Sequence, residues 1–178
     1  MKKLNLLVGT LVLGLGITLA CQSPAAAAKV YDNHAPAVLR HNWVSPLYRT
    51  PKSQRDARNY YWYRNLYVTN TQFHLEDFML SKNRTASYNS GPYGAFKGYY
   101  NLAYEKLSSC HYLVEGSMQP SGTKKVTEYG IALSHNYRTL KLYDFNHLKV
   151  IKDTVYPGKA HYVGKFHRGT AHYQQMMP

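Results

Sequence analysis

From Tyr60 onward, apolar and aromatic side chains recur at every second position of the chain. Successive side chains of a β-strand point to opposite faces, so this period is typical of strands with one face in a core. The pattern predicts an all-β protein with eight short strands. We expect them at residues 60–69, 72–80, 99–107, 111–118, 127–133, 140–143, 148–156 and 160–168.

The clearest hairpin signal lies in the middle of this region. Tyr129, Ile131 and Leu133 alternate with more polar neighbours, and Leu140 and Leu142 do so again. The residues between them, 134–138, are rich in turn-forming side chains. We therefore expect two antiparallel strands joined by a short turn.

Short turns between successive strands favour meander order. Such a chain can close into a small calycin-like barrel, which we expect, or can fold into a two-sheet β-sandwich. A barrel of this size is either filled by side chains or holds one small ligand. The exception is the Gly- and Ser-rich stretch Asn83–Gly98, which is too long for a tight hairpin. We expect it to be a loop, over the barrel mouth or at the edge of a sandwich.

The N-terminal residues have the features of an export signal. Lys2 and Lys3 precede the apolar run Leu4–Ala20, and small residues at Ala25–Ala28 offer a cleavage site. We therefore predict a signal peptide at 1–28, an irregular lead-in at 29–58 that lies on the domain surface or is partly mobile, and a single β domain at 59–178. The mature protein is then secreted, either extracellular or loosely associated with the cell wall, with no transmembrane segment after cleavage.

A second interpretation of the same N-terminus is a lipoprotein. Thr18–Cys21 partly resembles a bacterial lipobox, whose cysteine would be lipidated and would hold the protein on the outer face of the cell membrane. The motif departs from the usual pattern at Thr18, where an aliphatic residue is expected. Lipidation at Cys21 remains the alternative to simple secretion.

Composition limits what the mature chain can be. Residues 29–178 contain 20 Lys and Arg and 9 Asp and Glu, a formal charge of +11, and all 18 tyrosines. Cys110 is the one cysteine left, so no internal disulfide can form, which suits a Gram-positive exporter. Tyrosine rings can supply buried area that the few aliphatic residues do not.

Two stretches are candidates for ligand binding. The first is the aromatic and basic run Tyr61, Trp62, Tyr63 and Arg64, which could present a stacking surface for sugars; the alternative is core packing with a snorkelling arginine. The second is a basic patch at the last strand, for which protection of a sheet edge is the simple alternative. Its residues are Lys159, Lys165, His167 and Arg168.

No motif for catalysis is visible. The nine carboxylates do not select a pair by their spacing, and the adjacent Glu76 and Asp77 would point to opposite faces of a strand. We find no nucleophile elbow, no phosphate-binding loop and no metal-ligand spacing. We therefore predict a non-enzymatic protein with no catalytic residues, no cofactor and no metal site.

Two short motifs carry a resemblance. The run YRTPK at Tyr48–Lys52 and the run YYWYR at Tyr60–Arg64 look like those of small uncharacterised secreted proteins of lactobacilli. The resemblance implies a basic extracellular β domain. It carries no site residues over to this chain.

The charge of the mature chain suggests a partner. A field of this size concentrates a protein on polyanions, so we expect association with the cell wall through anionic polymers such as teichoic acids. Histidines would strengthen it as the surroundings acidify. The alternatives are a small-ligand-binding barrel and the lipid-anchored protein described above. Export removes the chain from nucleic acid, which we do not expect as a physiological partner, and the oligomeric state stays open.

Overall fold

The computed structural model describes residues 30–84, 87–97, 102–116, 127–145, 149–151, 154–156 and 159–170. These residues form β-strands and two short 3-10 helices, with no α-helix among them, so the all-β prediction is confirmed. Within the same residues no helix is long and apolar enough to cross a membrane. The expected signal peptide, including Cys21, lies outside the described residues.

The elements are short and follow one another closely. The 3-10 helices are η1 (Ala37–Leu39) and η2 (Lys52–Gln54). The strands are β1 (Val30–Asp32), β2 (Asn42–Val44), β3 (Tyr48–Arg49), β4 (Tyr61–Val68), β5 (Gln72–Leu80), β6 (Ser87–Lys97), β7 (Ala103–Lys106), β8 (His111–Gly116), β9 (Thr127–Leu133), β10 (Thr139–Phe145), β11 (Lys149–Ile151), β12 (Thr154–Tyr156) and β13 (Ala160–Arg168).

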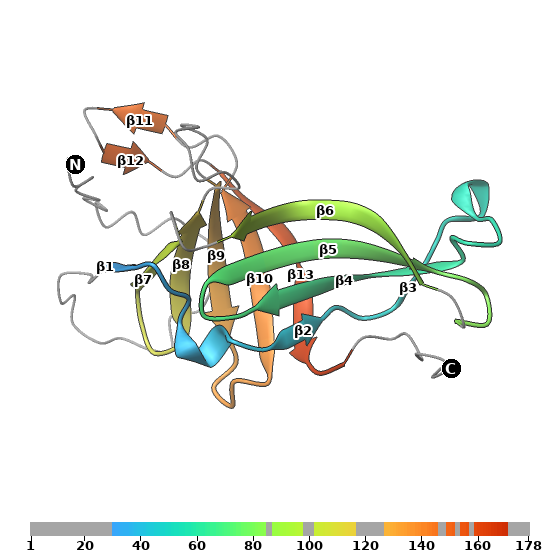
Figure 1. Ribbon diagram of the computed structural model, residues 1–178, viewed down its shortest axis with the longest axis horizontal. Coiled ribbons are helices and arrows are strands. Elements are labelled where there is room, and N and C mark those ends of the chain that lie inside the picture. The colour runs from blue at the N-terminus through green and yellow to red at the C-terminus, as the bar shows by residue number, and fades with distance from the viewer. Residues whose placement is uncertain are drawn as a thin grey trace.

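Eleven of these strands form one antiparallel sheet, shown in Figure 1. Its order is β1-β7-β8-β9-β10-β13-β2-β4-β5-β6, with β3 beside β4, while β11 and β12 form a separate hairpin. The prediction of eight strands in one meander was therefore wrong. Meander order holds from β7 to β10 and from β4 to β6, but β13 and β2 join the two blocks. The stretch 148–156, expected as one strand, contains β11 and β12.

The ladder of hydrogen-bonded strands has two ends, β1 and β6, among the described residues. The sheet nevertheless curls, because residues from distant strands share one core. Phe73 of β5 stacks on Tyr129 of β9 with ring centroids 5.2 Å apart and an interplanar angle of 20°. Figure 1 shows β4, β5 and β6 crossing over β9, β10 and β13 as a second layer. The main core lies between these layers.

The predicted hairpin is confirmed as β9 and β10. Its turn is held by the Ser134 hydroxyl, which accepts hydrogen bonds from the backbone N–H groups of Arg138 (3.2 Å) and Thr139 (3.0 Å). Tyr137 adopts a left-handed backbone conformation with φ of 54°. Asn136 Oδ1 also accepts from the Arg138 N–H at 3.1 Å, so two turn side chains stabilise this hairpin.

The stretch Asn83–Gly98 contains a strand, so its prediction as a loop was wrong. β6 pairs along its length with β5, and the register shifts where Pro92 and Gly94 oppose Glu76 and Leu75. Among the described strands, β6 ends the ladder and has β5 as its single neighbour. Proline and glycine are tolerated at such an edge, because a missing N–H or a local bulge breaks no second ladder.

Residues 30–58, which are the described part of the expected lead-in, belong to the β domain rather than to a surface lead-in. β1, β2 and β3 all pair with strands of the sheet. Leu39 and Trp43 are fully buried, and the indole Nε1 of Trp43 donates a 2.8 Å hydrogen bond to the Leu39 carbonyl. The prolines that suggested irregular structure lie between these short elements. The large side chains of Leu39 and Trp43 help to fill the core.

Candidate functional site

Tyr60 lies just before β4, where cations from three segments meet its side chain. Arg49 of β3 donates a 2.7 Å hydrogen bond from Nη2 to the Tyr60 hydroxyl. The Arg55 guanidinium lies 4.7 Å from the ring centroid and Lys82 Nζ lies 5.9 Å from it. We call these four residues the Tyr60 cluster. The hydrogen bond from Arg49 lowers the pKa of Tyr60, and the charges of the cations act in the same direction.

The loop between β3 and β4 fixes one of these cations, Arg55, in place. The Arg55 guanidinium donates to the Thr50 carbonyl from Nε (3.1 Å) and Nη2 (2.6 Å). The Thr50 hydroxyl donates to Asn59 Oδ1 at 2.9 Å. Asp56 Oδ1 accepts from the backbone N–H groups of Arg58 and Asn59, both at 2.7 Å. This Asx turn brings the chain back to Tyr60.

A fourth cation, Arg84, extends the cluster to Tyr61 of β4. The Arg84 guanidinium lies 5.1 Å from the ring centroid of Tyr61, and both Lys82 and Arg84 are exposed. The sequence analysis missed Lys82 and Arg84. The β4–β5 register pairs Tyr61 with Leu80, so residues just after Leu80 return beside Tyr60. A predicted register for the β4–β5 hairpin could have identified Lys82 and Arg84 as neighbours of Tyr60 and Tyr61.

Tyr61 and Tyr63 lie on the face of β4 turned away from the main core. Tyr63 is 1% exposed, and its ring stacks on Phe78 with centroids 5.3 Å apart. It belongs to a second small hydrophobic cluster with Val44 and Leu80, and Tyr61 packs against that cluster. Tyr63 is thus interior, whereas Tyr61 contributes one ring to the cationic surface.

Trp62 lies on the other face of β4 and stacks with Tyr48 of the neighbouring β3. Their ring centroids are 4.6 Å apart and the rings are 28° from parallel. The Arg64 guanidinium lies 5.5 Å from the Trp62 ring centroid. Tyr48 is 36% exposed, so this stack reaches the surface.

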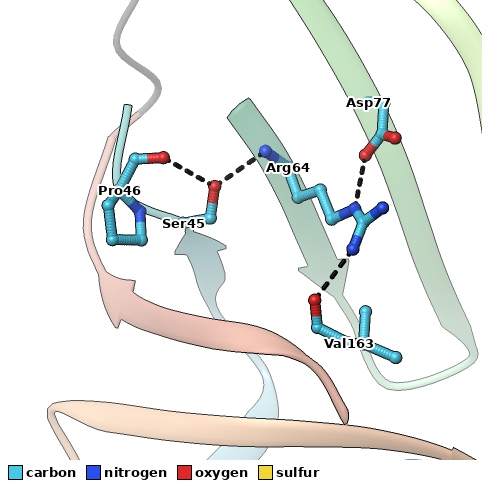
Figure 2. Close-up of polar contacts among 5 residues, drawn as sticks. All are labelled: Ser45, Pro46, Arg64, Asp77 and Val163. Atoms are coloured by element: carbon cyan, nitrogen blue, oxygen red, sulfur yellow. Dashed lines mark hydrogen bonds and ion pairs between the residues drawn. The ribbon is translucent and has the colours of Figure 1, made fainter. Parts of the chain in front are cut away.

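Arg64 is held by structural partners on three sides, as Figure 2 shows. Its Nε forms a 2.8 Å ion pair with Asp77 Oδ1, and its Nη1 donates a 2.8 Å hydrogen bond to the Val163 carbonyl. Its backbone N–H donates to the Ser45 hydroxyl at 2.8 Å. The side chain therefore links β4 to β13, although the short strand β2 lies between these two strands in the sheet. Glu76 and Asp77 lie on opposite faces, as predicted, because their partners on β4 are Asn65 and Arg64.

The four residues of the predicted patch on β13 do not act as edge protection. β13 is an inner strand between β10 and β2. Lys159, Lys165, His167 and Arg168 are all exposed. Lys165 lies opposite Lys141 of β10, and Arg168 lies opposite Trp43 of β2. The patch is therefore spread over the strand rather than gathered at one point.

Three glutamates from neighbouring strands form a carboxylate cluster that the sequence analysis missed. Glu115 of β8 lies directly opposite Glu128 of β9, and Glu105 of β7 is on the same face. Glu105 and Glu128 are 3% and 5% exposed, and one carboxylate oxygen of each has no hydrogen-bond partner among the described residues. Burial, followed by the charges of Glu115 and Glu105, raises the pKa of Glu128 to about 7.

The carboxylate cluster was hidden because strand alternation predicted these positions to be solvent-facing. Glu128 does point away from the core residue Tyr129 next to it. On the same face, however, the Phe145 ring covers Gly130, where a Cβ atom would approach Phe145 Cε2 to 2.7 Å. The register of β8 and β9, rather than sequence spacing, brings the charges together.

Two nucleophilic side chains lie near imidazoles at the β7–β8 turn. Ser108 Oγ is 2.8 Å from His111 Nδ1, and the Sγ of buried Cys110 is 4.0 Å from His135 Nδ1. Burial lowers the pKa of His111. In the part of the chain that the structure describes, neither imidazole donates a hydrogen bond to a carboxylate that would orient it. Ser108 and His111 are close in sequence within one turn, whereas Cys110 and His135 come from two turns and lie farther apart, and neither pair makes a triad.

In the described ranges, no group of three His, Cys, Asp or Glu side chains is arranged to hold a metal ion. Comparisons with protein-family models, with curated proteins and with solved structures found no match. The candidate site is therefore described from the positions of its own residues. Its most distinctive feature is the concentration of exposed cations around Tyr60 and Tyr61.

Proposed function

We propose that the protein is a secreted, non-enzymatic β domain that associates with the cell wall by binding anionic polymers such as teichoic acids. The observation that carries this proposal is the Tyr60 cluster together with Arg84. Four cations from three chain segments lie against two adjacent tyrosine rings. Such an arrangement attracts a ligand with closely spaced negative charges.

The tyrosine rings support this function by fixing the cations. A cation over a ring face is attracted by the quadrupole of the ring, so the side chain loses freedom before a ligand arrives. A preorganised group of cations then binds an anion at a smaller entropic cost. The formal charge of +11 on residues 29–178 adds long-range attraction to any polyanion.

The compartment is part of the proposal. A cleaved signal peptide releases the protein outside the cell, where wall polymers rather than nucleic acid are the available polyanions. If Cys21 is lipidated instead, the same cationic surface stands on the outer face of the membrane and meets the same polymers. The two routes differ in attachment and share the binding site.

The finer architecture is also a proposal. We infer that the curled sheet is a partly open barrel, because Phe73 and Tyr129 meet across it. A small-ligand carrier is the weaker alternative. The space inside the curl holds large side chains, among them Trp43, Phe73, Tyr129 and Phe166, all at 0% or 1% exposure. A surface ligand fits this packing better than an enclosed one.

Co-sedimentation with purified Gram-positive cell walls tests the proposal. We expect the exported protein to bind intact walls, to bind less after teichoic acid is removed, and to be released by salt. Binding should be stronger at pH 5 than at pH 7, because histidines gain charge.

A double variant connects this binding to the site. Lys82→Gln with Arg84→Gln should weaken sedimentation, whereas Arg138→Gln, an exposed arginine on the β9–β10 turn, should not. Equal binding to intact and stripped walls, or no binding at low salt and pH 5, would overturn the proposal.

A further inference from the structure

β13 contains a bulge that places two kinds of side chain on one face. Leu142 of β10 pairs with Gly164, but the next residue, Tyr143, pairs with Tyr162, so Val163 has no partner in the register. Tyr162 and Lys165 are three residues apart and would face opposite sides of a regular strand. The extra residue at Val163 brings both to the outer face, away from the core residue Phe166.

The bulge is held from outside its own pair of strands. The Val163 carbonyl accepts the hydrogen bond from Arg64 Nη1, and Arg64 is in turn anchored by Asp77. Figure 2 shows this side chain reaching from β4 to β13. Bulges often re-aim a side chain at a functional surface. Here Arg64 of β4 stabilises the bulge at Val163, and this bulge turns Tyr162 to the outer face.

The first feature of the outer face is a pair of lysines. Lys141 of β10 lies directly opposite Lys165 of β13, and both are exposed. Like charges in such a pair repel each other and destabilise the sheet. Neither lysine forms an ion pair with the residues that the structure describes. An acid group placed between them would relieve the repulsion.

The second feature is a pair of tyrosines beside the lysines. Tyr143 and Tyr162 oppose each other with ring centroids 5.5 Å apart, and Tyr162 is 59% exposed. Burial raises the pKa of Tyr162, and the nearby Tyr143 of β10 and Tyr48 of β3 raise this pKa further. Tyr48 itself stacks on Trp62 of β4.

We propose that the outer face of β10 and β13 binds an acidic polysaccharide, with a sugar ring against Tyr143 and Tyr162 and its acid group between Lys141 and Lys165. The proposal deepens the proposed function, on which it rests, by naming a sugar-based anion as the ligand and adding a second contact surface. Successive outward positions of a strand are about 7 Å apart, a spacing of the same order as one sugar unit.

The chemistry of this face favours a sugar over other polyanions. Tyrosine rings pack against the apolar face of a pyranose, and their hydroxyls can exchange hydrogen bonds with its hydroxyl groups. Lysine ammonium groups donate charge-assisted hydrogen bonds to carboxylate or phosphate oxygens. A polyanion without sugar rings would use the lysines alone and would gain nothing from Tyr162.

Binding of defined polymers to the full exported protein tests this. The probe is polygalacturonate, with its methyl-esterified form as the uncharged control and polyphosphate as an anion without sugar. We expect Lys141→Gln with Lys165→Gln to weaken polygalacturonate binding about tenfold. Tyr162→Ala should weaken polygalacturonate binding and leave polyphosphate binding unchanged.

Matched variants and the second polymer keep the outcomes distinct. Lys106→Gln on β7 and Tyr67→Ala on β4 remove an exposed lysine and an exposed tyrosine elsewhere, and should change neither affinity. If Tyr162→Ala weakens both polymers equally, or neither, the sugar-binding inference is overturned. If Lys82→Gln with Arg84→Gln still weakens polyphosphate binding in that case, the proposed function stands without it. If the protein binds neither polymer, both fail.

Discussion

The cations around Tyr60 and the carboxylates of β7, β8 and β9 are both groups of like charge, but water reaches them very differently. Lys82 and Arg84 are exposed, whereas Glu105 and Glu128 are almost fully buried. In Figure 1 the two groups lie in separate parts of the molecule, with β3 at the right and β7 and β8 at the left.

This difference decides what each group can do. Exposed cations are screened by water and salt, so their mutual repulsion costs little and their field stays available to a ligand. Buried carboxylates lose hydration, so they retain protons instead of charge. The cationic surface is therefore suited to binding, while the carboxylate cluster makes stability depend on pH.

The largest expected effect comes from neutralising the buried group. The folded protein holds the Glu128 proton up to a pKa of about 7, against 4.5 for an ordinary glutamate. Because the pKa of Glu128 is raised in the folded protein, its stabilising contribution to the unfolding free energy is fully present below pH 4.5. This contribution is lost as the pH rises through 7. The loss is about 3 kcal/mol of unfolding free energy.

Glu128→Gln should remove this loss. Denaturant unfolding across pH 4 to 8 should show the variant gaining on the natural protein as pH rises, with little difference at pH 4. Glu76→Gln on β5 makes the same charge change outside the carboxylate cluster and serves as the control. A difference that does not change with pH would contradict the burial argument.

The next largest effect concerns Arg64 of β4, whose side chain is held by Asp77 and by the Val163 carbonyl. Arg64→Met removes the ion pair with Asp77 and the hydrogen bond to the Val163 carbonyl. Losing these two contacts should lower the unfolding free energy by about 2 kcal/mol. Arg138→Met, at an exposed position, should change it by less than about 0.5 kcal/mol. Equal losses in the two variants would show that the link between β4 and β13 is unimportant for stability.

A smaller effect should appear in the titration of Tyr60. The hydrogen bond from Arg49 and the nearby cations lower the pKa of Tyr60. Ultraviolet titration should show one tyrosine ionising before the others, and Tyr60→Phe should remove that step. Arg49→Gln should move the step to higher pH. An unchanged curve in both variants would show that the cations do not gather around Tyr60.

The smallest expected effect is on stability at the exposed cations. Lys82→Gln with Arg84→Gln removes two cations whose described contacts are with tyrosine rings. The unfolding free energy should change by less than about 0.5 kcal/mol. Thermal or denaturant unfolding of this variant checks the point. A large loss would mean that these cations are structural, like Arg64.

Local pattern was sufficient to predict much of the fold. Strand alternation located β5 and β9, and turn chemistry located the β9–β10 hairpin, because both depend on neighbouring residues. Pairing between distant segments was not accessible in this way. β13 joins β2 through His167 and Val44, which lie more than a hundred positions apart, and no local signal records that choice.

The same limit explains the site. The run from Tyr61 to Arg64 was recognised as aromatic and basic, but its residues separate because Tyr63 and Trp62 lie on opposite faces of β4. Lys82 joins the cluster only through the β4–β5 register. The proline- and glycine-rich strand β6 was missed for the opposite reason, since its composition resembles a loop while its pairing with β5 makes it a strand.

The salt dependence of polyphosphate binding tests the central claim most directly. Each cation that contacts the polymer releases counterions, so the logarithm of the affinity should fall linearly with the logarithm of salt concentration. We expect a steep slope for the natural protein, a clearly shallower one for Lys82→Gln with Arg84→Gln, and no change for Arg138→Gln. Identical slopes for all three proteins would show that the surface around Tyr60 does not bind the polymer.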